Sequence, residues 1–156
     1  MIERVLCQAV AFHADGNFAA AAPLYRAVLA TAPDHAEANH LLGMILAQQG
    51  QVETASVFLA KASASPDATP EMHNNFGVTL HGLGRADQAA DAFMKALEAR
   101  PDYAEAFNNL GALYKDAGKA KEAVAAFRKA LELQPDYAVA AENLRAAFNL
   151  AGSPAV

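Results

Sequence analysis

The sequence predicts an all-α solenoid, a stack of helical hairpins that repeats every 34 residues. Glycines recur at this interval, as Gly16, Gly50, Gly84, Gly118 and Gly152. Small and large residues keep the same phase, as Ala21, Ala55, Ala89 and Ala123, and as Tyr25, Leu59, Phe93 and Phe127. A fixed period with small and large positions in phase is typical of a helical repeat array.

The clearest unit spans residues 104–137. Apolar residues recur at helical spacing on both sides of Gly118, with Phe107 before it and Phe127 after it. Gly118 can adopt the left-handed conformation that ends a first helix, and Pro135 cannot continue the second. Neither helix can bury its apolar face alone, so neighbouring units must stack.

The same pattern predicts four hairpins and one single helix. The expected helices are 2–14 with 18–30, 36–49 with 52–64, 70–82 with 86–99, and 104–117 with 120–133, followed by 138–151. Asp34 and Asp102 are expected to cap first helices, and Thr69 is expected to cap the helix that Pro70 begins. Pro23 predicts a late start or a kink, unless the first turn tolerates it.

The second unit is the least regular. Ser63 and Ser65 stand where apolar residues are usual, and the segment SASPDATP over residues 63–70 holds two prolines. The period continues across this break. We expect an ordered loop here, with a hinge as the alternative.

Several residues of the last full unit resemble the tetratricopeptide repeat signature, namely Leu110-Gly111, Tyr114, Gly118, Ala123, Phe127, Ala130 and Pro135. The resemblance implies a right-handed superhelix with a concave groove lined by first helices. It covers one repeat domain over residues 1–152, with units 2–35, 36–69, 70–103 and 104–137, a terminal capping helix 138–151 and a tail 153–156.

Composition restricts the function. The formal net charge of −5 and the pI near 5.4 disfavour nucleic-acid binding, which needs a basic face. No stretch has the ~20 apolar residues of a membrane span. Cys7 is the single cysteine, expected as a small packing residue. These features suggest a cytoplasmic protein.

Asparagines form a ladder on the predicted first helices. In register they are Asn75, Asn109 and Asn143, with a neighbouring row of His40, Asn74, Asn108 and Glu142, and a third row that includes His81 and Lys115. A carboxamide both donates and accepts hydrogen bonds, so such a row suits the backbone of an extended peptide. The ladder is similar to that of O-linked N-acetylglucosamine transferases, although asparagine is common at this position in the family whatever the ligand.

Acidic residues form a second ladder, as Glu3, Glu37, Glu71 and Glu105. They predict either an acidic rim for basic or neutral partners or first-turn carboxylates that complement the helix dipole. The family's clamp for acidic C-terminal peptides needs several basic side chains, and Lys115 is the one available at the matching positions.

No catalytic motif, metal site or cofactor site is predicted, since the five histidines lack partners at ligand spacing. We therefore expect a non-catalytic protein–protein interaction scaffold that binds an extended peptide or a partner helix in the groove. One alternative is the substrate-recognition region of a larger glycosyltransferase that resembles the O-linked N-acetylglucosamine enzymes. Another is homotypic assembly through Leu144 and Phe148 of the last helix.

Overall fold

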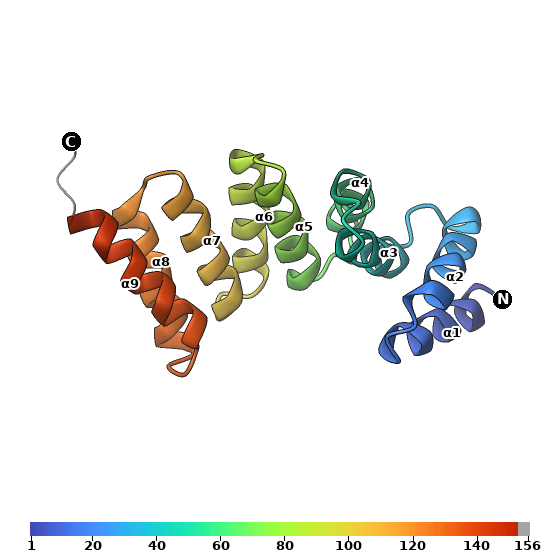
Figure 1. The fold of residues 1–156 in the computed structure, drawn as a ribbon. Helices are drawn as coiled ribbons and strands as arrows, with labels where there is room; N and C mark the ends of the chain where they lie inside the picture. The colour runs from blue at the N-terminus through green and yellow to red at the C-terminus, as the bar shows by residue number, and fades with distance from the viewer. Residues whose placement is uncertain (153–156) are drawn as a thin grey trace.

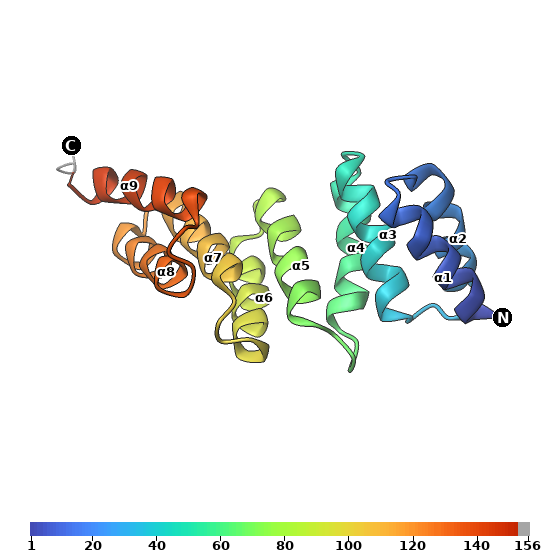
Figure 2. The ribbon, with the colours of Figure 1, turned by 90° about the horizontal axis from the view of Figure 1, so that it is seen from below.

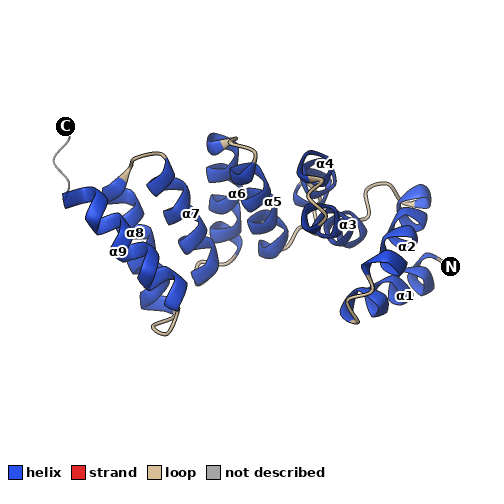
Figure 3. Cartoon of the chain, viewed as in Figure 1, coloured by secondary structure: helices blue, strands red, loops and turns tan. Residues whose placement is uncertain are grey.

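Nine α-helices and no strand make up residues 1–152, the part of the chain that this computed structural model describes (Figures 1 and 3). They are α1 (Ile2–Ala14), α2 (Phe18–Thr31), α3 (Ala36–Gln48), α4 (Val52–Ser63), α5 (Pro70–Gly82), α6 (Ala86–Ala99), α7 (Ala104–Asp116), α8 (Ala120–Leu133) and α9 (Ala138–Gly152). The predicted boundaries agree within one residue. The predicted tail, 153–156, lies outside the described residues.

The helices form an α-solenoid, as predicted. The odd-numbered helices α1, α3, α5 and α7 each pair with the helix that follows, and α9 packs against α8. Successive hairpins stack from α1 at one end to α9 at the other (Figures 1 and 2). The first helices also contact one another from hairpin to hairpin, α3 with α5, α5 with α7 and α7 with α9. The buried apolar residues form several clusters that follow one another along the stack.

Close packing within each hairpin depends on a small residue in the first helix. A Cβ atom added to Gly111 would lie 2.7 Å from the ring of Phe127, and one added to Gly77 would lie 2.7 Å from the ring of Phe93. These distances are shorter than carbon–carbon contact allows, which explains why this position stays small.

The tight turns inside the hairpins also follow the sequence prediction. Gly118 ends α7 with φ at 72°, and the corresponding glycines of the other hairpins have φ between 71° and 77°. The next backbone N–H, from Lys119, donates to the carbonyl of Tyr114 at 2.8 Å. A positive φ costs glycine little and is strained for other residues, so the recurring glycine has a backbone cause.

The caps of the first helices were predicted less well. Thr69 caps α5 as expected, because its hydroxyl accepts from the backbone N–H of Met72 at 3.4 Å. The prediction for Asp34 is wrong: the cap residue of α3 is His35, whose Nδ1 accepts from the N–H of Ala38 at 3.3 Å. Asp102 likewise lies one residue too early, since α7 is preceded directly by Tyr103, which makes no side-chain cap bond.

Pro23 lies inside α2, and the helix is continuous from Phe18 to Thr31. The predicted late start therefore does not occur. Pro23 is exposed and belongs to the second turn of the helix.

Candidate functional site

One side of every first helix points away from its hairpin partner, and we call this side the open face. In α5, Gly77 touches Phe93 of α6, whereas the next residue, Val78, is 46% exposed. Successive residues lie 100° apart around a helix, so the sides can be assigned from such contacts. The middle of the open face carries Val10, Met44, Val78 and Ala112, flanked by His40, Asn75, His81, Asn109 and Lys115.

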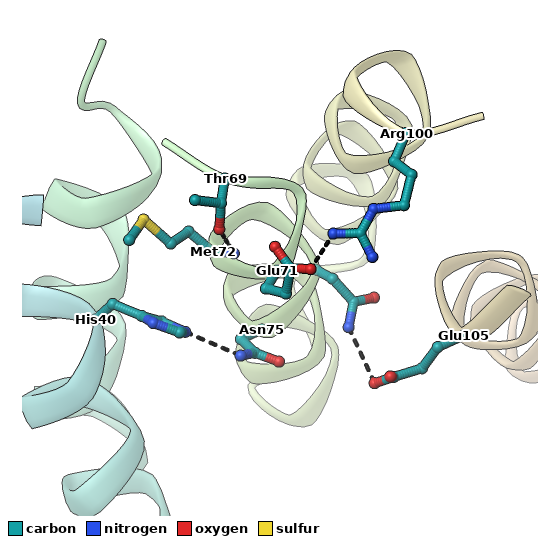
Figure 4. Close-up of polar contacts among 8 residues, drawn as sticks. His40, Thr69, Glu71, Met72, Asn75, Arg100 and Glu105 are labelled. Atoms are coloured by element: carbon teal, nitrogen blue, oxygen red, sulfur yellow. Dashed lines mark hydrogen bonds and ion pairs between the residues drawn. The ribbon is translucent and has the colours of Figure 1, made fainter. Parts of the chain in front are cut away.

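The predicted asparagine ladder is a network of hydrogen bonds between repeats. Asn109 Nδ2 donates to Asn74 Oδ1 at 3.0 Å, and Asn143 Nδ2 donates to Asn108 Oδ1 at 3.0 Å. Asn75 Nδ2 lies 2.9 Å from His40 Nε2, which extends the same pattern to α3 (Figure 4). The ladder therefore connects α3, α5, α7 and α9 to one another, and no ligand is needed for these bonds.

The two rows of this ladder differ in accessibility. Asn74 and Asn108 are 0% and 5% exposed, so they lie inside the wall. Asn75 and Asn109 are half-buried, and their Oδ1 atoms have no hydrogen-bond partner among the described residues. Each of these two side chains therefore keeps one acceptor that the hydrogen bonds between repeats leave unused.

Two glutamates of the predicted acidic ladder have tertiary partners. Glu71 forms an ion pair with Arg100 at the end of α6, and Glu105 accepts from Asn74 Nδ2 at 3.2 Å (Figure 4). The hydrogen bond from Arg100 lowers the pKa of Glu71. Burial, and then the charge of Glu105, raise the pKa of Tyr103 to about 12, so its hydroxyl stays protonated. Both carboxylates thus also stabilise the fold.

The remaining predicted polar residues lie at the border of the open face. His81 Nε2 lies 3.0 Å from Asp116 Oδ2 of the next repeat. Lys115 is half-buried. Burial lowers the pKa of His40, and so does His13, whereas Glu71 raises it. His40 is therefore a neutral ring near neutral pH.

Sequence reasoning missed the apolar middle of the open face. Val78 is exposed, and Val10 and Met44 are half-buried, one in each of the first three repeats. The 34-residue period and the 100° helical spacing together could have identified them, since all lie one residue after the small position that packs on the second helix. Arg100, which forms the ion pair with Glu71, lies 29 residues away from it. Neither the 34-residue period nor the helical spacing could have identified this pair.

The predicted assembly residues are not equally exposed. Leu144 packs against the cluster formed by Ala123, Phe127 and Ala147, so it is partly covered. Phe148 is 45% exposed, and the guanidinium carbon of Arg128 lies 5.3 Å from the centre of its ring. Cys7, expected to pack, is exposed instead.

The part of the chain with described side chains holds no group of three or more histidine, cysteine, aspartate or glutamate residues placed to hold a metal ion. Its helices also include none long and apolar enough to cross a membrane.

Comparisons with known proteins agree with this architecture. Two family models, both described as tetratricopeptide repeat, match residues 12–74 and 68–136. A crystal structure of MamA protein aligns with a TM-score of 0.88 at 22% identity, covering 97% of this chain and 82% of that one. YrrB, a repeat protein with an unusual peptide-binding site, aligns at 0.82 with 19% identity, covering 93% and 75%.

A third solved structure is the first repeat domain of Spaghetti (RPAP3) bound to the HSP90 peptide SRMEEVD. It aligns with a TM-score of 0.72 at 22% identity and covers 76% of this chain and 94% of that chain. No curated protein matches the chain by sequence.

Proposed function

Because the chain belongs to the tetratricopeptide repeat family, a family of interaction modules, we propose that it is a non-catalytic scaffold that binds an extended peptide along its open face. The observation that carries this proposal is the exposed side chain of Val78, in the middle of a face bordered by amides, imidazoles and one lysine. Two of the similar solved structures are described as peptide-binding or peptide-bound repeat proteins.

The apolar middle of the open face sets the first requirement on the ligand. Val10, Met44 and Val78 line the first three repeats, and the smaller Ala112 follows in the fourth. The alanine leaves less apolar surface for a ligand to cover. Burying aliphatic surface is favourable at about 25 cal/mol per Å². The peptide should therefore place aliphatic residues against repeats 1 to 3.

The charges of the same face set the second requirement. Glu3 and Glu37 are exposed, and the chain as a whole carries a formal net charge of −5. Lys115 is the one lysine among the residues that define the open face. An acidic peptide such as the one bound to RPAP3 would meet carboxylates here, so we infer a ligand that is basic or neutral.

The amides set the third requirement. The Oδ1 atoms of Asn75 and Asn109 can accept backbone N–H groups of an extended ligand, while their Nδ2 atoms remain engaged between repeats. Alanine at all three ladder asparagines would also loosen the stack. Val78 is therefore a cleaner site for a test than the ladder.

The experiment uses three synthetic peptides, with alternating Leu and Lys, Leu and Glu, or Ser and Lys. Titration followed by amide chemical shifts should show the Leu/Lys peptide binding to the odd-numbered helices. Val78→Asn should weaken it roughly tenfold, about 1.4 kcal/mol. The matched control is Val57→Asn, because Val57 is 57% exposed on a second helix, α4. Shifts confined to even-numbered helices, or equal losses in both variants, would contradict the proposal.

The alternative function is that of a substrate-recognition region in a larger glycosyltransferase. A longer reading frame that encodes a catalytic domain would support this alternative. The run His73-Asn74-Asn75-Phe76-Gly77 favours it, because it resembles runs in the N-terminal repeats of such enzymes. Peptide binding by the open face is required in this alternative too. The assembly alternative depends on the exposed part of Phe148 and stays a prediction.

A further inference from the structure

The last helix, α9, differs from the other first helices at the position that faces a second helix. In α3, α5 and α7 this position is a glycine, and a Cβ atom added to it would lie 2.7 Å from a side chain of the second helix. Arg145 occupies the same position in α9 and is exposed. Its long side chain would clash with a helix packed at that distance. A further helix therefore cannot cover this side of α9 in the way that second helices cover the others.

We call this side of α9 the end surface and define it by Ala141, Arg145 and Phe148, with Arg128 of α8 beside them. Ala147 is fully buried against the array. Arg145 precedes Ala147 by two residues and so lies about 160° around the helix from it. Phe148 lies only about 60° from Arg145, which places the ring and the guanidinium on the same outward side.

Phe148 supplies an apolar contact at this surface. Its side chain is 45% exposed, whereas the equivalent residues of α3 and α5, Leu46 and Leu80, are 2% and 1% exposed. Those leucines are covered within their own hairpins. An aromatic ring has a large area to bury, so a segment that covers Phe148 should bring an apolar side chain of its own.

Two arginines give the end surface a positive charge. The guanidinium carbon of Arg128 lies 5.3 Å from the centre of the Phe148 ring. Arg128 and Arg145 are both exposed, and neither belongs to an ion pair among the described residues. Glu142 is the single acidic residue of α9, and it forms no ion pair with them in the same part of the chain. Both guanidiniums are thus available to carboxylates of a partner.

The charge of the chain is distributed unevenly along the array. Residues 1–103 contain 11 acidic and 6 basic residues, whereas residues 104–156 contain 6 of each. The formal net charge of −5 therefore belongs to the first three repeats. The open face there exposes Glu3 and Glu37, which disfavour an acidic ligand. The end surface has the opposite preference.

We propose that the end surface binds an acidic segment of a partner protein. A leucine or phenylalanine of that segment packs on Phe148, and neighbouring carboxylates pair with Arg145 and Arg128. Two arginines with Glu142 nearby suit a few discrete carboxylates better than the continuous charge of a nucleic acid, which needs a basic face. This surface is separate from the open face, so the array could hold two partners of opposite charge.

The peptide of alternating Leu and Glu is the probe for this surface. Titration followed by amide chemical shifts should show changes in α9 and around Arg128, and none around Val78. Arg145→Glu should weaken binding roughly tenfold, because attraction between the charges becomes repulsion. The matched control is Arg4→Glu, which reverses an exposed arginine of α1, the first helix at the opposite end of the array, and should leave the affinity unchanged.

Further arms of the experiment identify the occupant. A peptide of alternating Ser and Glu should bind more weakly than the Leu/Glu peptide, because it has no apolar side chain for Phe148. Tighter binding of a single-stranded oligonucleotide of equal charge would overturn the proposal. So would sedimentation that shows self-association of the natural sequence and its loss in Arg145→Glu, since a second copy would then be the occupant.

The result is also independent of binding to the open face. Arg145→Glu should leave the shifts that the Leu/Lys peptide causes around Val78 unchanged, so each proposal can fail while the other stands. Equal losses of Leu/Glu binding in Arg145→Glu and Arg4→Glu, or shifts confined to the region of Val78, would overturn the assignment of the end surface.

Discussion

The junction between repeats 2 and 3 and the junction between repeats 3 and 4 use the same backbone architecture with different chemistry. At the second, Leu97 packs against a cluster that includes Leu80, Phe93 and Leu110. At the first, Ser63 and His73 form a polar pair beside a pocket that is open to solvent. The period of the array is kept at both, so a repeat can preserve its geometry while the side chains that contact the next repeat change from apolar to polar.

This difference has an energetic meaning in a solenoid. Stability is approximately a sum of repeat terms and nearest-neighbour interface terms, so a substitution at one junction should act mainly on the two repeats that meet there. Substitutions at the two junctions test this expectation.

The largest effect is expected for Leu97→Ser, which gives the second junction the residue type of the first. Removing a partly buried leucine should lower the stability of the α6–α7 contact by about 2 kcal/mol. Amide hydrogen exchange in α7 would measure it. The control Glu98→Ser changes an exposed neighbour and should have little effect. Unchanged protection of α7 would mean that Leu97 does not hold the junction.

The reverse substitution, Ser63→Leu, should strengthen the first junction. The added aliphatic carbons fill the pocket, and each buried methylene contributes roughly 0.8 kcal/mol, offset by the lost bond to His73. We expect a gain of about 1 kcal/mol, measured by denaturant unfolding. Thr54→Leu also replaces a hydroxyl side chain with leucine, at an exposed site of α4, and serves as the control. A loss of stability in Ser63→Leu would show that the polar pair outweighs the filling of the pocket.

The smallest effect is expected for Arg100→Met, which removes the ion pair inside repeat 3. Both side chains are about two-fifths exposed, so solvent screens the pair and its loss should cost little stability. The pKa of Glu71 is lowered in the folded chain, so the pair stabilises above the ordinary value of 4.5 and is lost as the pH falls through the lowered one.

Melting temperatures of the natural sequence and Arg100→Met should therefore differ near neutral pH and converge in acid. Hydrogen exchange at both junctions should stay the same, because the pair lies within one repeat. A constant difference in melting temperature down to acidic pH would exclude the ionised pair as its cause.

Much of the fold could be predicted because its determinants are local and periodic. Gly118 and its equivalents mark turns whose backbone requires a positive φ, and Thr69 with Pro70 marks a helix start. The cap of α3 could not be predicted in this way. His35 accepts through a ring nitrogen, whereas aspartate, the residue at the preceding position, is among the usual cap residues.

The site was predicted in part. The asparagines were found by register, but register alone does not show that Asn109 bonds to Asn74 of the preceding repeat. That pairing depends on how neighbouring hairpins are rotated, which is a property of the assembled stack. Ser63 is irregular in the repeat pattern. Its hydrogen bond to His73 depends on how α4 packs against α5, which the sequence alone does not show.

The asparagine bonds also bear on how such a chain can change in length over evolution. Their partners lie 35 residues apart, one more than the period of 34, so every bond joins one unit to the unit before it. Duplication of residues 104–137 as a whole would place a new asparagine pair at the correct separation on both sides of the copy. An insertion that shifted a first helix relative to the preceding one would leave a buried amide without its partner. The polar network therefore favours growth and shortening by complete repeats.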